Sequence, residues 1–182
     1  MNILITGGAS GLGEALTRNL AKEKNNLVYI TYSSSFKNAK SLENEFSNVR
    51  IIKCDFSLVE DVFRLLDKIE GLNLEVLINN AYNGKFLDNY FHKTNTNDFL
   101  TSFEANIIPS INITQRAICS FRKNKKGKII TILTSALLDN PPIGSSIYLA
   151  NKAYLKKMTQ IWATENAKYN IVSNTVSPSM LK

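Results

Sequence analysis

The sequence has few of the residues on which several classes of protein depend. Its 182 residues include only two cysteines and one histidine. Cys54 and Cys119 are far apart in the chain, and no cluster of Cys, His or acidic residues at metal-ligand spacing surrounds His92. We therefore expect neither a structural disulfide nor a metal site.

Long apolar runs are missing too. No stretch of the sequence approaches the roughly 20 apolar residues that a membrane helix needs. The first apolar run, residues 2–5, reaches Thr6-Gly7-Gly8 before it could serve as the apolar core of a signal peptide. We expect a cytoplasmic protein with no membrane partner.

The chain carries an excess of positive charge, with 22 Lys and Arg against 15 Asp and Glu and a net charge of +7. Such an excess suits nucleic acid, an anionic membrane surface or phosphorylated ligands. The densest basic run, residues 122–128, has no aromatic side chain on which a base could stack. We interpret this run as a solvated loop between a helix and a strand, and expect no nucleic-acid partner.

Short apolar runs alternate with longer helical patterns along a chain that is 44% hydrophobic. This alternation is typical of βαβ units, and consecutive apolar positions are typical of strands covered on both faces. Right-handed crossovers then predict one α/β domain over residues 1–182, a Rossmann-type doubly wound parallel sheet in three layers with strand order 3-2-1-4-5-6. The predicted strands are residues 2–6, 27–32, 49–55, 76–79, 128–134 and 171–176.

Two long helices are predicted on either side of the fifth strand, over residues 98–121 and 146–168. Pro109 falls inside the first of them. Because proline lacks the amide hydrogen that a helix needs, we expect a kink there.

A glycine-rich segment, Thr6-Gly7-Gly8-Ala9-Ser10-Gly11-Leu12-Gly13, joins the first predicted strand to the first helix. Glycines at such a place allow a tight turn, close approach of the backbone to a pyrophosphate and close packing of helix on strand. The helix N-terminus adds unpaired N–H groups for the phosphates. The segment therefore predicts dinucleotide binding.

Tyr148 and Lys152 lie four residues apart in a predicted helix and so project from the same face. A nearby ammonium group favours the phenolate and lowers the pKa of a tyrosine from its usual value near 10. Tyr148 is therefore a candidate general acid or base. Taken alone, such a pair is also what a packed tyrosine and a surface lysine would give.

The spacing Gly7-x-x-x-Gly11-x-Gly13 is similar to the glycine loop of the classical short-chain dehydrogenase/reductase family. Asp55-Phe56 after the third strand and Asn79-Asn80-Ala81 after the fourth resemble further motifs of that family, although Tyr82 follows where glycine is usual. Ser135 precedes Tyr148 by 13 residues, as in the family. The resemblance extends to Pro178, after which Ser179 again replaces the usual glycine.

The resemblance implies an NAD(P)(H)-dependent oxidoreductase, similar to 3-oxoacyl-carrier-protein reductases, that transfers a hydride between nicotinamide and a small-molecule carbonyl or secondary alcohol. Tyr148 would move the proton, Ser135 would hydrogen-bond the substrate oxygen, Lys152 would hold the nicotinamide ribose and lower the tyrosine pKa, and Asn106 would anchor a proton-relaying water. The cofactor-binding residues so implied are Gly7, Ser10, Gly11, Leu12, Gly13, Ser33, Ser34, Asp55, Phe56, Asn80, Ala81, Tyr148 and Lys152.

The second strand favours NADP(H) over NAD(H). An acidic residue about 20 positions beyond the glycines would bind the ribose 2′-hydroxyl and repel a 2′-phosphate. The corresponding segment, residues 32–37, has serine hydroxyls and Lys37 but no carboxylate. Its serines could form a phosphate clamp or an ordinary polar turn.

Other expectations concern the ends and walls of the domain. The family continues beyond the sixth strand into a substrate-covering segment and a last strand, so the sequence is interpreted as C-terminally truncated. The resemblance also implies a homodimer or homotetramer built on the two long helices.

Two segments are expected to wall the substrate pocket: residues 82–97, with Phe86, Tyr90, Phe91 and His92, and loop 136–147. The aromatic side chains either line the pocket or pack on a neighbouring helix.

Two other functions stay open from the sequence. A catalytically silent nucleotide-binding protein of the same fold would account for Tyr82, Ser179 and the short C-terminus. A sugar-nucleotide epimerase or dehydratase of the extended branch would share the Tyr148–Lys152 pair, but its glycine loop has a different spacing.

Overall fold

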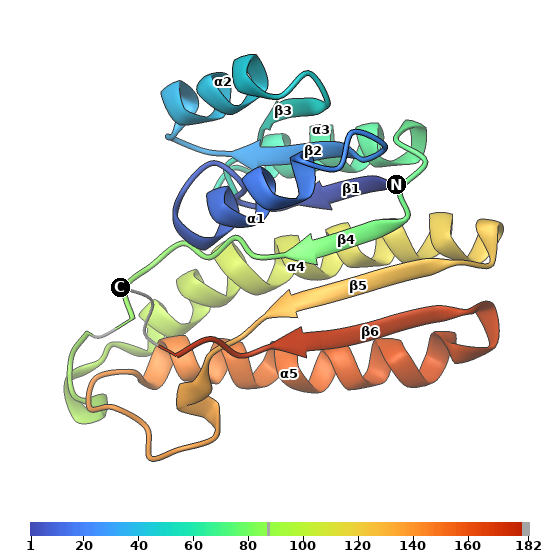
Figure 1. Cartoon of the computed structure of the whole chain (residues 1–182). Helices are drawn as coiled ribbons and strands as arrows, with labels where there is room; N and C mark the ends of the chain where they lie inside the picture. The colour runs from blue at the N-terminus through green and yellow to red at the C-terminus, as the bar shows by residue number, and fades with distance from the viewer. Residues whose placement is uncertain (87, 180–182) are drawn as a thin grey trace.

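Parallel strands form one sheet, six-stranded in the described part of the chain, in the order β3-β2-β1-β4-β5-β6 (Figure 1). The computed structural model describes residues 1–86 and 88–179, so that Leu87 of the expected pocket wall and residues 180–182 of the expected domain lie outside it. The strand order confirms the predicted doubly wound α/β fold. The strands are β1 (Asn2–Ile5), β2 (Leu27–Tyr32), β3 (Val49–Lys53), β4 (Val76–Asn79), β5 (Gly127–Ile132) and β6 (Ile171–Val176).

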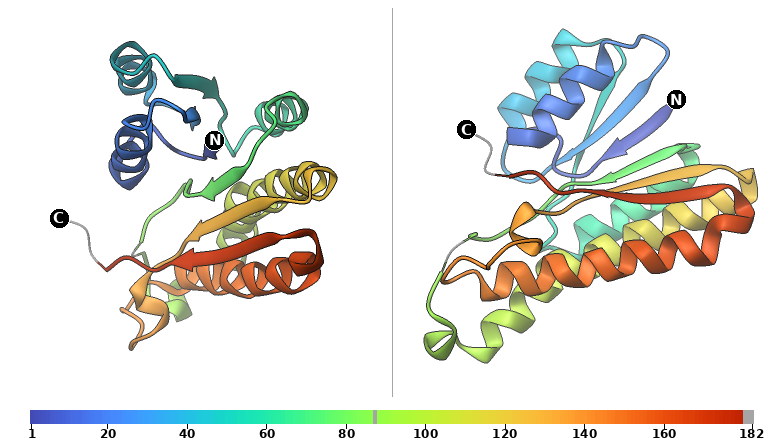
Figure 2. Two further views of the ribbon diagram at one scale, coloured as in Figure 1. Left: turned by 45° about the vertical axis from the view of Figure 1, so that its right-hand side comes forward. Right: turned by 60° about the horizontal axis from the view of Figure 1, so that its bottom comes forward.

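Helices cover both faces of this sheet (Figure 2). On one face, α1 (Gly11–Ala21) and α2 (Phe36–Glu45) enclose a core with the side chains of β1 and β2. On the other face, α3 (Val59–Gly71), α4 (Thr96–Asn124) and α5 (Ser146–Asn166) enclose a larger core around Leu77, Ile113 and Phe121. These three layers are the ones predicted. None of the helices in the described residues is both long and apolar enough to span a membrane.

Some predicted boundaries are wrong by a few residues. β3 ends at Lys53 and β5 at Ile132, two residues earlier than expected in each case. After β5, the Thr134 side chain accepts a hydrogen bond from the Ala136 amide at 3.3 Å and starts a 3-10 turn. α4 runs unbroken through Pro109 for 29 residues. Backbone pairing still continues one residue past β3 and past β5, because the Cys54 amide donates to the Tyr32 carbonyl and the Leu133 amide to the Val176 carbonyl, both at 2.8 Å.

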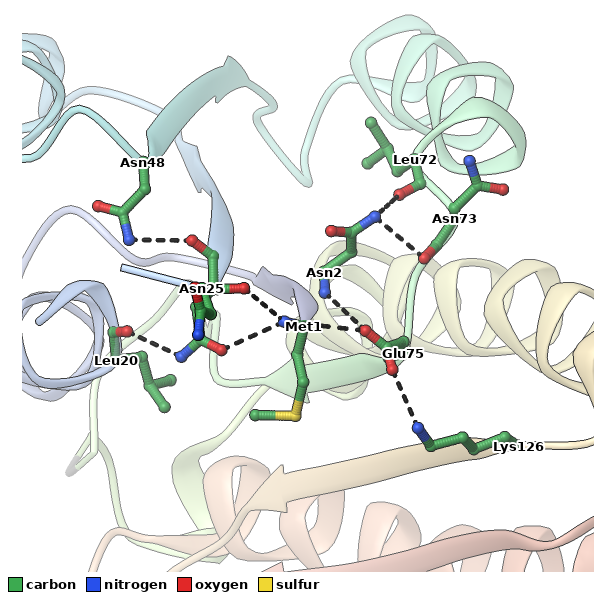
Figure 3. A network of polar contacts seen from close by, with 10 residues as sticks. Met1, Asn2, Leu20, Asn25, Asn48, Leu72, Asn73, Glu75 and Lys126 are labelled. Atoms are coloured by element: carbon green, nitrogen blue, oxygen red, sulfur yellow. Dashed lines mark hydrogen bonds and ion pairs between the residues drawn. The ribbon is translucent and has the colours of Figure 1, made fainter. Parts of the chain in front are cut away.

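A polar network ties the amino ends of the central strands together (Figure 3). The terminal ammonium of Met1 donates to the carbonyl of Asn25 at 2.8 Å. Glu75 accepts from the Asn2 amide at 3.2 Å and from Lys126 Nζ at 3.1 Å, and these bonds, the one to Lys126 above all, lower the pKa of its carboxyl group. The network joins β1, β4 and β5 at their amino ends, and the glycine-rich segment lies at the opposite, carboxyl end of the strands.

Candidate active site

The glycine-rich segment forms a tight turn between β1 and α1. Gly7 has a φ of 64°, which favours glycine. A Cβ at Gly13 would lie 2.0 Å from the Gly7 carbonyl oxygen, so no larger residue fits while the turn keeps this shape. The Thr17 hydroxyl shares its one hydrogen between the Gly8 and Gly13 carbonyls, both 2.9 Å from Oγ1, and holds the turn against the helix. The predicted phosphate-binding turn is thus built as its glycines require.

Asn80, after β4, fixes the same turn from the other side. Its Nδ2 donates to the carbonyls of Thr6 at 2.9 Å and Gly7 at 3.0 Å. The Thr6 hydroxyl in turn accepts from the amides of Asn80 and Ala81, both at 3.0 Å. These four hydrogen bonds place the loop after β4 directly beside the glycine turn.

A cleft of about 250 Å³ opens above these two loops. It brings together nine of the residues predicted to bind cofactor, whereas Gly11 and Ser34 do not line it and are exposed. Ser35, one residue further along, lines the cleft instead. The nine predicted residues that line it are Gly7, Ser10, Leu12, Gly13, Ser33, Asp55, Phe56, Asn80 and Ala81.

Asp61 positions the Asp55 loop and was not predicted. It is 2% exposed, its Oδ2 accepts from the Asp55 amide at 2.9 Å, and its other oxygen pairs with Arg64. The bond from the Asp55 amide, with help from Arg64, lowers the pKa of its carboxyl group. An acid in the first turn of α3 is an ordinary surface feature in sequence, so only its burial and its bond from the Asp55 amide show that it holds the Asp55 loop.

A second cavity, of about 300 Å³, adjoins the cleft and shares Leu12, Asn80 and Tyr82 with it. Tyr148 and Lys152, both on α5, line this second cavity together. The structure therefore confirms that one face of α5 presents both side chains, and it places them next to the cleft above the glycine turn.

Burial shapes the protonation of this pair. Lys152 is 4% exposed and its Nζ donates to the Ile132 carbonyl at 2.8 Å. Burial lowers the pKa of its ammonium to about 8. Burial also raises the pKa of half-buried Tyr148, and neighbouring Tyr82 raises it further, while a hydrogen bond with Thr134 lowers it. The expected lowering of the Tyr148 pKa is thus absent here, because the Lys152 ammonium lies against a carbonyl rather than against the phenol oxygen.

Ser135 does not line this cavity, whereas its neighbour Thr134 does. The Ser135 amide donates to the Pro178 carbonyl at 2.9 Å, which ties the 3-10 turn after β5 to the segment after β6. The hydroxyl next to Tyr148 in this structure therefore belongs to Thr134. The 13-residue spacing to Tyr148 predicts Ser135 instead.

Asn106, on α4, is 1% exposed and binds the backbone of Asn83 on both sides. Its Oδ1 accepts from the Asn83 amide at 2.6 Å and its Nδ2 donates to the Asn83 carbonyl at 2.8 Å. In the structure it secures the loop after β4. The water-anchoring role implied by the resemblance stays a prediction.

Aromatic rings surround Tyr148. Tyr82 and Phe86 both meet its ring edge to face, with centroid distances of 4.9 Å and 5.0 Å. Phe86 thus lines the cavity, which is one of the two predicted alternatives for the aromatics of this segment; the other is packing on a neighbouring helix. Tyr90, Phe91 and His92 do not line either cavity, and Phe91 is 74% exposed.

The chain is similar to known proteins along its whole length. The model of the short chain dehydrogenase family matches residues 1–182. A 3-oxoacyl-[acyl-carrier-protein] reductase of Rickettsia bellii is 31% identical over 180 residues, 98% of this chain and 72% of that protein. A very-long-chain 3-oxoacyl-CoA reductase of Coccidioides immitis is 27% identical over 191 residues, 98% of this chain and 54% of that protein.

Solved structures share the fold over almost the same length. An ElxO variant with NADPH bound is 28% identical, with a TM-score of 0.86 over 100% of this chain and 74% of that one. A short chain dehydrogenase/reductase family protein is 25% identical, with a TM-score of 0.87 over 98% of this chain and 73% of that one.

Proposed function

The chain belongs to the short-chain dehydrogenase family and is an NAD(P)-dependent oxidoreductase of carbonyl and alcohol substrates, and from this premise we propose which residues do the work and which nucleotide they prefer. One observation carries the proposal. The glycine-turn cleft and the Tyr148–Lys152 cavity adjoin through shared Leu12, Asn80 and Tyr82, so a nucleotide lying in the cleft would reach the pair.

The cleft suits a dinucleotide. Gly13 leaves room that any Cβ would fill, and the first N–H groups of α1 border the turn where a pyrophosphate would lie. Asp55 and Phe56 would contact the adenine, and Asn80 and Ala81 the ribose near the nicotinamide. When bound, the nicotinamide supplies or accepts the hydride.

The proton moves through Tyr148. In reduction its hydroxyl donates to the substrate oxygen as charge builds there, and in oxidation its phenolate accepts the hydroxyl proton. The buried Lys152 ammonium, released from the Ile132 carbonyl, would bind the ribose and favour the phenolate. Ser135, which adjoins the cavity-lining Thr134 but does not line the cavity itself, would hydrogen-bond the oxygen of a bound substrate, and Thr134 would hold Tyr148.

NADP(H) is the favoured nucleotide. The end of β2 that borders the cleft has Ser33 and Ser35 but no carboxylate, so nothing there repels a 2′-phosphate. Lys37, exposed in the first turn of α2, adds a positive charge close by. The solved relative with bound NADPH is consistent with this choice.

We also propose that the protein assembles as a homodimer or homotetramer through α4 and α5. Exposed apolar side chains on these helices, Leu100 and Ile108 on α4 and Tyr154 and Ile161 on α5, would be covered by a partner copy. Sedimentation velocity tests this: a species of twice or four times the chain mass is expected, and a monomer at all concentrations would contradict it.

Turnover is tested by following NADPH absorbance with 3-oxo esters, since two relatives are named as reductases of 3-oxoacyl groups. We expect steady oxidation of NADPH, with NADH at least about tenfold less efficient in kcat/KM. NADPH binding without oxidation by any carbonyl compound would instead favour the catalytically silent alternative.

A further inference from the structure

Tyr82 lies on the boundary between the cleft and the second cavity and lines both of them. Its backbone is held on both sides. Ala81 donates to Thr6 Oγ1 at 3.0 Å, and Asn83 exchanges two hydrogen bonds with buried Asn106. The Tyr82 ring is therefore presented to the site from a fixed piece of chain.

The ring contacts both members of the proposed catalytic pair. Its centroid lies 4.9 Å from that of Tyr148, with an interplanar angle of 82°. Lys152 Nζ lies 5.0 Å from the Tyr82 centroid, within cation–π range. Asn151 Nδ2 donates to the Tyr82 hydroxyl at 3.4 Å and to Ser102 Oγ at 2.9 Å, which joins the far end of the ring to α5 and α4.

These contacts put a bulky side chain against the Tyr148 ring, beside the space that the reacting carbonyl would occupy. If the Tyr148 hydroxyl donates its proton to the substrate oxygen, the carbonyl carbon and its two substituents lie within a few ångströms of the Tyr148 ring. That neighbourhood is already occupied on one side by Tyr82. Its ring does not yield without loss of the hydrogen bond from Asn151 and strain on the flanking backbone, which Thr6 and Asn106 hold.

We propose that Tyr82 is a specificity-determining residue that limits one substituent of the substrate carbonyl to a small group such as methyl. This inference rests on the proposed reductase function and names the substrate class of the same site: carbonyl compounds with one small and one larger substituent. Tyr82 acts by filling space rather than by moving a proton.

The test compares two 3-oxo esters that differ only in that substituent, ethyl acetoacetate with a methyl group and ethyl benzoylacetate with a phenyl group. The wild type should reduce the methyl compound with the higher kcat/KM. Tyr82→Ala should raise the phenyl-to-methyl ratio of kcat/KM about tenfold or more, because a steric exclusion is removed. Tyr82→Phe retains the ring and should keep the wild-type ratio within about twofold.

NADPH affinity, from fluorescence titration, and the melting temperature are measured for each variant. Tyr90→Ala, on an exposed ring of the same segment outside both cavities, is the matched control and should leave every value unchanged. Should Tyr82→Ala fold poorly, Tyr82→Leu removes the ring but retains much of the apolar packing, and it should shift the ratio in the same direction.

The outcomes separate this inference from the function on which it rests. An active wild type whose substrate ratio does not change in Tyr82→Ala or Tyr82→Leu would overturn the inference alone. Equal gains with both esters together with tighter NADPH binding would also overturn it, because Tyr82 would then obstruct the nucleotide rather than the substrate. If neither wild type nor variants oxidise NADPH with either ester, the proposed function fails and the inference with it.

Discussion

Tyr148 is the residue on which the proposed chemistry depends most directly. Its phenol oxygen is the proposed proton donor and acceptor, while its ring contributes only part of the cavity wall. Tyr148→Phe should therefore lower kcat about 10²–10⁴-fold. NADPH affinity should stay within about threefold of wild type, measured by fluorescence titration, since most of the nucleotide cleft is elsewhere. Turnover at the wild-type rate would refute the assignment.

Thr134 gives a pH-dependent prediction at the same scale. Its hydrogen bond lowers the pKa of Tyr148, so Thr134→Val should raise that pKa. In the oxidation direction, where the phenolate is the active form, the rise of kcat/KM with pH should then move to higher pH. Under the proposed roles, Ser135→Ala should lower kcat without this displacement, because its hydroxyl would bind the substrate oxygen rather than Tyr148. Profiles of kcat/KM against pH for both variants test whether Thr134 and Ser135 have these separate roles. An identical displacement of the profile in both variants would contradict them.

The turn between β1 and α1 shows at the scale of an element why glycine spacing is informative. Gly13→Ala would place a methyl group 2.0 Å from the Gly7 carbonyl oxygen, and backbone must move to relieve it. We expect NADPH affinity to fall at least about tenfold and the melting temperature to drop. Gly71→Ala, at the end of α3, meets nothing within 4 Å and serves as the control. It should bind NADPH normally and gain up to about 1 kcal/mol of stability.

The strands and helices could be predicted from the sequence because each is determined largely by the pattern of its own residues. The apolar runs of β1, β2 and β4 and the glycine turn gave the fold and the cleft. Contacts between distant segments could not be predicted in this way. In sequence, Asp61 looks like an ordinary surface acid, and only the structure shows that it accepts a hydrogen bond from the Asp55 amide. Thr134 rather than Ser135 lines the cavity, and the Thr134 side chain caps the 3-10 turn that begins at Ser135.

At the scale of the whole molecule, stability and the proposed chemistry favour different residues between the sheet and α5. The apolar layers favour burial without charge, whereas the proposed chemistry needs an ammonium group between β5 and α5. Lys152 has only partial compensation there, from the Ile132 carbonyl and the rings of Tyr82 and Tyr148. We therefore expect the buried ammonium to lower the free energy of unfolding at neutral pH.

That conflict predicts how the free energy of unfolding depends on pH. Burial lowers the pKa of Lys152 to about 8 from an unfolded value of 10.5, so between these values the unfolded chain binds more protons and stability rises with pH. Below pH 8 the folded protein carries the cost of the buried ammonium, at most about 3 kcal/mol. Lys152→Met, which removes the charge but keeps an apolar stem, should therefore be more stable than wild type at pH 7 and should lose that advantage toward pH 10.5. Urea unfolding of both proteins across this range measures the difference, and a gap that does not vary with pH would show that the buried ammonium is fully compensated.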